Sequence, residues 1–391
     1  MTFENKYIEI IYTMHVDVSY SKQRGKIYKS VLLRQTYRKN GKIGHKTIAN
    51  LSRCSSQEIE AIKLALKYKK DLSVLGNIKE IKTEQGFSVG AVVLLYQLSK
   101  RLRIEKTLGF SKEGKLILWQ VIARLIQPFP KLASVRLASR HAALEILGME
   151  AFNEDDVYEA LSWLEKEQGR IEKQLYEKRY RKQGCGLFLY DVTSTYLEGD
   201  KNELADFGYN RDKKRGKKQI VIGLLTDEEG EPVSVQVYSG ETSDLISAEI
   251  VHSRYKDLGL VEWAFRDMKT EHLEIRPVNV RKGNHTRAHV FIVMLAYLIR
   301  RELERCWQEV EVTVKEGIDE LSQLCSVFMK YDVERFQSIP SPRSLGKKLL
   351  ELAGVKLPDD LPLRKKNVYT RKKIAGRRKL KKVDIPLSLV A

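Results

Sequence analysis

Asp191 stands at a position where its carboxylate could do chemistry. The four residues before it, Leu187–Tyr190, form a short apolar run that predicts a strand covered on both faces. Asp191 then lies at the predicted end of that strand. Because a buried, unpaired carboxylate is costly, Asp191 must either be neutralised by a partner or point into a cleft.

One predicted helix carries a second carboxylate, an ammonium group and a phenol at regular spacing. Tyr255, Glu262 and Lys269 are spaced seven residues apart, so they fall in one line along the helix. The buried face of the same helix is predicted to consist of Leu258, Val261, Phe265 and Met268. The line lies about 80° from the centre of this face, at the margin where residues that line a cleft are found.

Purely structural interpretations of these residues remain open. Glu262 and Arg266 have the i,i+4 spacing of a surface ion pair, and Lys269 would then be solvated. Asp191 would cap the Thr-Ser-Thr turn that follows it.

Composition favours a polyanionic partner. The 391 residues include 70 Lys or Arg and 51 Asp or Glu, a net charge of +19. The four cysteines are far apart and form no CxxC pair, which argues against a zinc ribbon or a disulfide framework. The start of the chain is not typical of a signal peptide, and the apolar run at 290–299 is too short to span a bilayer. We therefore expect a cytoplasmic, nucleoid-associated protein without a membrane partner.

The order of predicted elements indicates an α/β protein of four parts. In residues 1–75 we expect a small β-meander with a turn at Asn40-Gly41. A helix follows it, and the capping box at Ser55–Glu58 marks the start of that helix. This part is predicted to bind DNA. Residues 76–184 predict a helical domain. Residues 185–304 predict a three-stranded meander (187–190, 219–226 and 232–239) and two helices, the second buried between Val290 and Ile299. Residues 305–391 predict a helical segment and a basic tail.

Two basic segments suit phosphate contact. Residues 212–218, DKKRGKK, connect two predicted strands, and residues 363–382 carry eleven Lys or Arg and no acid. A solvated hairpin connection and a tail that aids solubility are the alternatives.

Several segments carry a resemblance to a known family. They are YDVTSTYLEGD, FGYNRDKKRGKKQIVIGLLTDEEGEPV, the Tyr, Glu and Lys within RYKDLGLVEWAFRDMK, LEIRPV with its later Arg, and RAHVFIVMLAYLIRREL, together with KTIANLSR near the start. The chain resembles the DDE insertion-sequence transposases of the IS4 superfamily, and specifically their IS1634-like branch.

The resemblance implies a truncated ribonuclease H-like core that acts on double-stranded DNA as a homodimer and uses Mg²⁺ or Mn²⁺. Asp191 and Glu262 correspond to the first and last carboxylates of the triad, which would hold the metal. Leu258 replaces the arginine of the family's Tyr, Arg, Glu, Lys signature. The residues expected to contact DNA are Tyr255, Arg266, Lys269, Lys213, Lys214, Arg215, Lys217, Lys218, Arg371, Lys372, Lys373, Arg377 and Arg378.

The chain departs from the family pattern at the second aspartate. The family places this residue at the end of a fourth strand, but here YSGETSD ends at Asp244 and the helix that carries Glu262 begins almost at once. We expect an internal deletion near 244–247 and a transposase that is catalytically defective. The alternative is a non-catalytic DNA-binding remnant that occupies transposon ends and inhibits transposition.

Overall fold

The computed structural model divides the chain into two compact units. The first comprises residues 1–82 with 330–335, and the second comprises 83–329 with 336–391. The structure describes residues 13–23, 25–39, 42–69, 82–128, 130–180, 187–197, 201–208, 216–242, 258–269, 273, 275, 280–331 and 334–362. Within this part of the chain no helix is long and apolar enough to cross a membrane.

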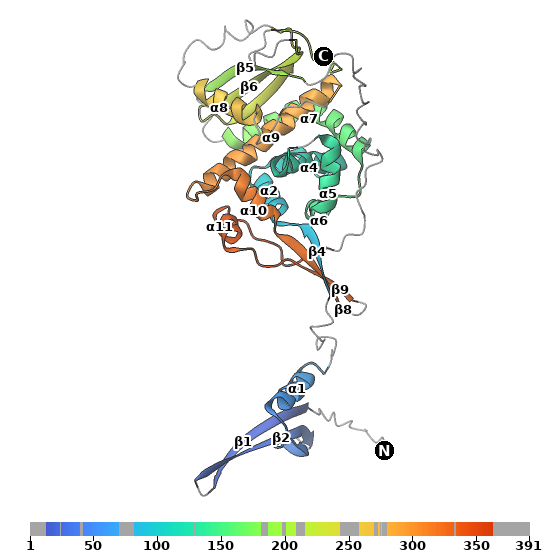
Figure 1. Cartoon of the computed structure of the whole chain (residues 1–391), viewed down its shortest axis with the longest axis vertical. Coiled ribbons are helices and arrows are strands. Elements are labelled where there is room, and N and C mark those ends of the chain that lie inside the picture. The colour runs from blue at the N-terminus through green and yellow to red at the C-terminus, as the bar shows by residue number, and fades with distance from the viewer. Residues whose placement is uncertain are drawn as a thin grey trace, which may run out of the picture. The chain divides into compact units, whose positions relative to one another are not determined.

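The first unit is an antiparallel meander with one helix (Figure 1). Its elements are β1 (Thr13–Gln23), β2 (Lys26–Lys39), β3 (Lys42–Asn50) and α1 (Ser56–Lys67). Lys39 pairs with Lys42, which confirms the predicted two-residue connection between the second and third strands. The capping box is also confirmed, because the Glu58 amide donates to Ser55 Oγ and the Ser55 amide to Glu58 Oε2. Val31, Leu51 and Ile59 form its small core.

Helices make up most of the second unit. They are α2 (Gly90–Arg101), α3 (Ile104–Leu108), α4 (Lys112–Ile126), α5 (Lys131–Arg140), α6 (Ala143–Leu147), α7 (Glu154–Tyr180), α8 (Leu258–Lys269), α9 (Gly283–Trp307), α10 (Val314–Ser322) and α11 (Ser344–Leu352). α4, α7 and α9 pack against one another. The prediction of a core helix is confirmed, because every residue of α9 from Val290 to Ile299 is buried.

A three-stranded antiparallel sheet lies against these helices (Figure 1). Its strands are β5 (Phe188–Tyr196), β6 (Gln219–Asp227) and β7 (Pro232–Tyr238), in that order. The predicted meander is therefore confirmed. α8 packs on β5 and β6, whereas α7 and α9 pack on β7. β6 is the central strand and is buried along almost its whole length, which explains its continuous apolar sequence.

The sequence prediction missed a second sheet, most of which lies in this unit. Strand β4 (Lys82–Ser88) pairs with β8 (Cys325–Tyr331), which pairs in turn with β9 (Glu334–Ser338). The region after residue 305, predicted to be helical, therefore contains two strands between α10 and α11. Their sequences alternate too weakly to distinguish them from helix, and their pairing partner is remote in sequence.

A buried histidine makes the stability of the second unit dependent on pH. His289 is 4% exposed, and its Nε2 donates to the Ile275 carbonyl at 3.1 Å. Burial lowers the pKa of His289 well below its usual range, and the charges of Lys131 and Arg124 lower it further. The folded state therefore keeps His289 neutral, whereas the unfolded chain takes up a proton below about pH 6.5.

We expect the free energy of unfolding to fall as the pH drops below about 6.5, with His289 contributing up to about 1.4 kcal/mol per pH unit. Urea unfolding between about pH 7.5 and 5 measures this slope. Glutamine at position 289 keeps a donor but does not titrate, so the His289→Gln variant should show a flatter profile. An unchanged slope in that variant would rule out the role of His289.

Candidate functional site

Asp191 lies within a strand and not at its end. β5 continues to Tyr196, and Asp191 pairs with Leu224 of the central strand. The prediction of a strand end here was wrong because Val192, Thr193 and Thr195 are β-branched and extend the strand. Asp191 is half-buried.

Asp191 faces the helix that carries the second predicted carboxylate. Alternate residues of a strand share a face, so Asp191 and Thr193 lie on the same side of the sheet. Lys269 at the end of α8 donates to Thr193 Oγ1, and it also donates to the Ser194 carbonyl at 2.7 Å. α8 therefore covers the face of β5 on which Asp191 lies. Lys269 is half-buried and hydrogen-bonded, so its interpretation as a solvated lysine was wrong.

The outward face of α8 carries Glu262 and Arg266, and both are exposed. The predicted buried face is confirmed for Val261, Phe265 and Met268, which are at most 4% exposed. The Arg266 guanidinium lies over the Trp263 ring, 5.6 Å from its centroid. Among the described residues, Arg266 thus stacks on an aromatic ring and does not form the expected surface pair with Glu262.

The two ends of α8 show how the helix runs along the sheet. Leu260 lies beside Gly230, in the turn that joins β6 to β7, and this turn is at the Phe188 end of β5. Lys269 reaches Thr193, nearer the other end of the strand. α8 therefore runs in the same direction as β5, and Asp191 lies level with its central turns.

The opposite face of β5 carries a tyrosine that stays neutral. Tyr190 lies across Gly223, where a Cβ atom would be 2.1 Å from its hydroxyl oxygen, so this contact requires glycine. Burial raises the pKa of Tyr190, and the Tyr238 hydroxyl 3.3 Å away and the charge of Asp191 raise it further. The phenol therefore packs as a neutral group behind Asp191.

The described residues do not form a complete metal site. No three His, Cys, Asp or Glu side chains among them are grouped so that they could hold an ion. Asp191 and Glu262 project from different layers, one toward α8 and the other to the surface. Hard divalent cations such as Mg²⁺ need several oxygen ligands together, so this donor set does not fit the expected Mg²⁺ or Mn²⁺.

Most of the predicted DNA-contact residues lie outside the described part of the chain. Those outside it are Tyr255, Lys213, Lys214, Arg215, Arg371, Lys372, Lys373, Arg377 and Arg378. Asp244 also lies outside it. Lys217 is exposed, whereas Lys218 lies over the Phe207 ring at 5.6 Å and is half-buried.

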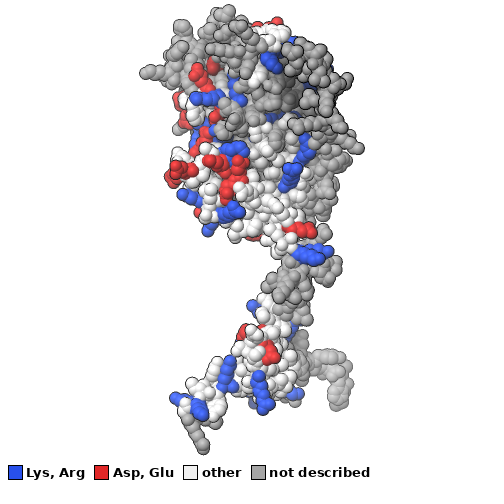
Figure 2. All heavy atoms as spheres, viewed as in Figure 1, with Lys and Arg blue, Asp and Glu red and all other residues white. Residues whose placement is uncertain are grey.

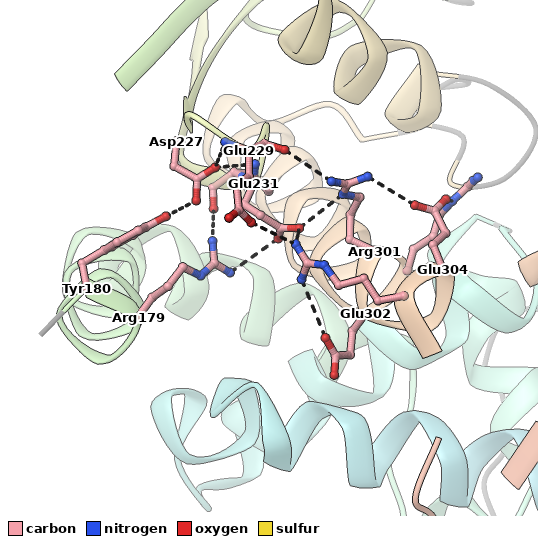
Figure 3. Close-up of polar contacts among 11 residues, drawn as sticks. Arg179, Tyr180, Asp227, Glu229, Glu231, Arg301, Glu302 and Glu304 are labelled. Atoms are coloured by element: carbon pink, nitrogen blue, oxygen red, sulfur yellow. Dashed lines mark hydrogen bonds and ion pairs between the residues drawn. The ribbon is translucent and has the colours of Figure 1, made fainter. Parts of the chain in front are cut away.

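An ion-pair network that the sequence analysis did not predict joins the sheet to two helices (Figure 3). Its centre is Glu231, in the turn before β7, with a side chain only 5% exposed. Glu231 contacts Arg301 at 3.2 Å, Arg305, and Arg179 of α7 at 3.8 Å. The acidic turn DEEGEP and the basic LIRREL of α9 were visible signals, but nothing in the sequence pairs one with the other.

The N-terminal unit has a counterpart among known protein families. Residues 16–74 match the model of the N-terminal domain of IS1634 family transposases. Comparisons of the chain with curated proteins and with solved structures gave no match. The matched residues begin within β1 and include β2, β3 and α1. The N-terminal unit is therefore similar to the N-terminal domain of IS1634 family transposases, and this similarity supports an insertion-sequence transposase.

Proposed function

We propose that this chain is an insertion-sequence transposase of the DDE type that binds double-stranded DNA but lacks a complete cleavage site. The observation that carries the proposal is the match of residues 16–74 to a transposase N-terminal domain. The net charge of +19 supports a polyanionic partner. In this proposal Asp191 and Glu262 occupy the positions of the first and last carboxylates of a ribonuclease H-like core.

The spacing of elements after β7 supports an internal deletion in the core. Residues 239–257, nineteen in all, separate β7 from α8. A crossover of at least a dozen residues and a fourth strand of about five would take up nearly all of them. The resemblance to the family also implies an inserted subdomain between the fourth strand and the helix of Glu262, and too few residues remain for it. We therefore assign no strand-cleavage step to this chain, and infer that it is a defective transposase or a remnant that occupies transposon ends.

Nicking and binding should be measured together on DNA that carries the gene with its flanks. We expect wild type and Asp191→Asn to shift this DNA equally in gels and to leave it uncut with Mg²⁺ or Mn²⁺. Asp319→Asn, an exposed substitution on α10 that also removes one carboxylate, is the matched control. Nicking that is lost only in Asp191→Asn would show that another carboxylate completes the site. It would then refute the proposed catalytic defect. Failure of wild type to bind DNA would refute the proposed function itself.

A further inference from the structure

The β1–β2 hairpin extends beyond the small core of the first unit. We call residues 19–23 of β1 and 26–30 of β2 the ribbon. The last pair inside the core is Val18 with Val31, and Val31 is only 2% exposed. Beyond it, Tyr20 is 67% exposed, Ile27 71% and Tyr28 54%. In the part of the chain that the structure describes, large side chains are therefore exposed on both faces of the ribbon.

The pairing register distributes large side chains over both faces of the ribbon. On one face Tyr20 pairs with Lys29 and Lys22 pairs with Ile27. On the other face Tyr28 pairs with Ser21. A strand pair that packs on a protein surface is apolar on one face and polar on the other. This ribbon is aromatic and cationic on both, which suits a partner that surrounds it.

The charge of the surrounding sequence identifies the partner as a polyanion. Residues 18–57 contain ten Lys or Arg and no Asp or Glu. The nearest acids are already engaged, because Asp17 pairs with Arg34 at 2.9 Å and Glu58 caps α1. In Figure 2 the hairpin end of this unit shows basic side chains, and the acidic ones gather toward α1.

The dimensions of the ribbon match a DNA groove. Five residues per strand span about 17 Å, and two strands lie about 4.8 Å apart, to which side chains add several ångströms. The major groove of B-form DNA is about 12 Å wide and admits a two-stranded ribbon. The corresponding groove of A-form RNA is too narrow and deep for side chains to read. The occupant that fits is therefore duplex DNA.

We propose that the ribbon enters the major groove of double-stranded DNA with its two faces toward the opposite walls of the groove. Lys22 and Lys29 then reach phosphates on one side and Lys26 on the other, and Tyr20 and Tyr28 pack against the two walls. This inference rests on the proposed function, because it assigns a surface to the DNA binding proposed above. It is independent of the cleavage site.

The first test replaces two ribbon lysines in the full chain. A labelled mixed-sequence duplex of about 30 base pairs serves as the probe, and its anisotropy gives the affinity over a range of salt. Lys26→Gln/Lys29→Gln should reduce the slope of log K against log salt by about two and weaken binding about tenfold or more near 0.1 M salt. Lys63→Gln/Lys67→Gln, on α1 of the same unit, is the charge-matched control and should change the slope much less.

The outcomes separate this inference from the proposed function. An equal loss of affinity in both double variants would mean that binding depends on overall charge, and would overturn the role proposed for the ribbon. Tight binding by wild type together with no loss in the ribbon variant would also overturn it, while the proposed function would stand. Failure of wild type to bind the duplex refutes the proposed function. Circular dichroism confirms that each variant is folded.

The second test shows which groove of the DNA duplex the ribbon enters. Guanine N7 lies in the major groove, so wild type should protect it from dimethyl sulfate, and Tyr20→Ala/Tyr28→Ala should reduce the protection. Protection confined to adenine N3 would assign the ribbon to the minor groove and overturn the proposal. An RNA duplex of the same sequence should compete at least about tenfold less well than DNA; equal competition would also overturn the assignment.

Discussion

Replacement of Glu231 by alanine is expected to lower the free energy of unfolding of the second unit by about 3 kcal/mol. Glu231 is buried among Arg179, Arg301 and Arg305, so its loss leaves three guanidinium groups close together without their shared acceptor. The Glu304 carboxylate, 3.6 Å from the Arg301 guanidinium, still neutralises part of this positive charge. We therefore expect a loss at the lower end of the range for breaking a buried ion pair. Urea unfolding followed by tryptophan fluorescence measures it, because all four tryptophans lie in this unit.

Glu229 provides the matched control two residues earlier in the same turn. Its side chain is 73% exposed and approaches Arg305 only at 3.7 Å. Glu229→Ala should therefore cost at most about 0.5 kcal/mol. If both variants lose the same stability, the network acts through general charge, and Glu231 has no special position in it.

Replacement of Trp119 by alanine is expected to destabilise the same unit by about 4 kcal/mol. Trp119 is completely buried in α4, and its Nε1 donates to the Ser134 carbonyl at 3.0 Å. The substitution creates a large cavity and removes the donor from a buried carbonyl. The urea midpoint, measured by far-ultraviolet circular dichroism so that the lost fluorophore does not matter, should shift down with little change in the slope m.

Trp263→Ala removes the same atoms from an exposed site. Trp263 is 51% exposed on α8, where it contacts Arg266. We expect less than about 1 kcal/mol of destabilisation, since little buried surface is lost. Equal effects of the two substitutions would mean that the core around Trp119 relaxes to fill its cavity.

Local signals in the sequence predicted several elements correctly. Ser55 and Glu58 predicted the start of α1, and the continuous apolar residues of β6 and α9 predicted buried elements. Each of these signals depends on residues within a few positions of one another. Val261, Phe265 and Met268 were placed on the buried face of α8 for the same reason.

The errors occurred where contacts between elements distant in the sequence determine the structure. The Thr-Ser-Thr segment after Asp191 is compatible with a turn or with a strand, and pairing with β6 selects the strand. Lys269 was left open as a solvated residue because only the packing of α8 on β5 reveals its acceptors. Glu231 and its arginines come from three elements that no sequence period relates.

The pairing of β4 with β8 imposes an order on folding. The Phe87 amide donates to Ser326 Oγ across 239 positions of the chain. At ribosomal rates of about 5–20 residues per second, β8 emerges about 12–50 seconds after β4. The meander of the first unit contains only short-range pairings and can form within that interval. During synthesis the nascent chain therefore carries a finished basic meander for many seconds before the partner strand of β4 has been made.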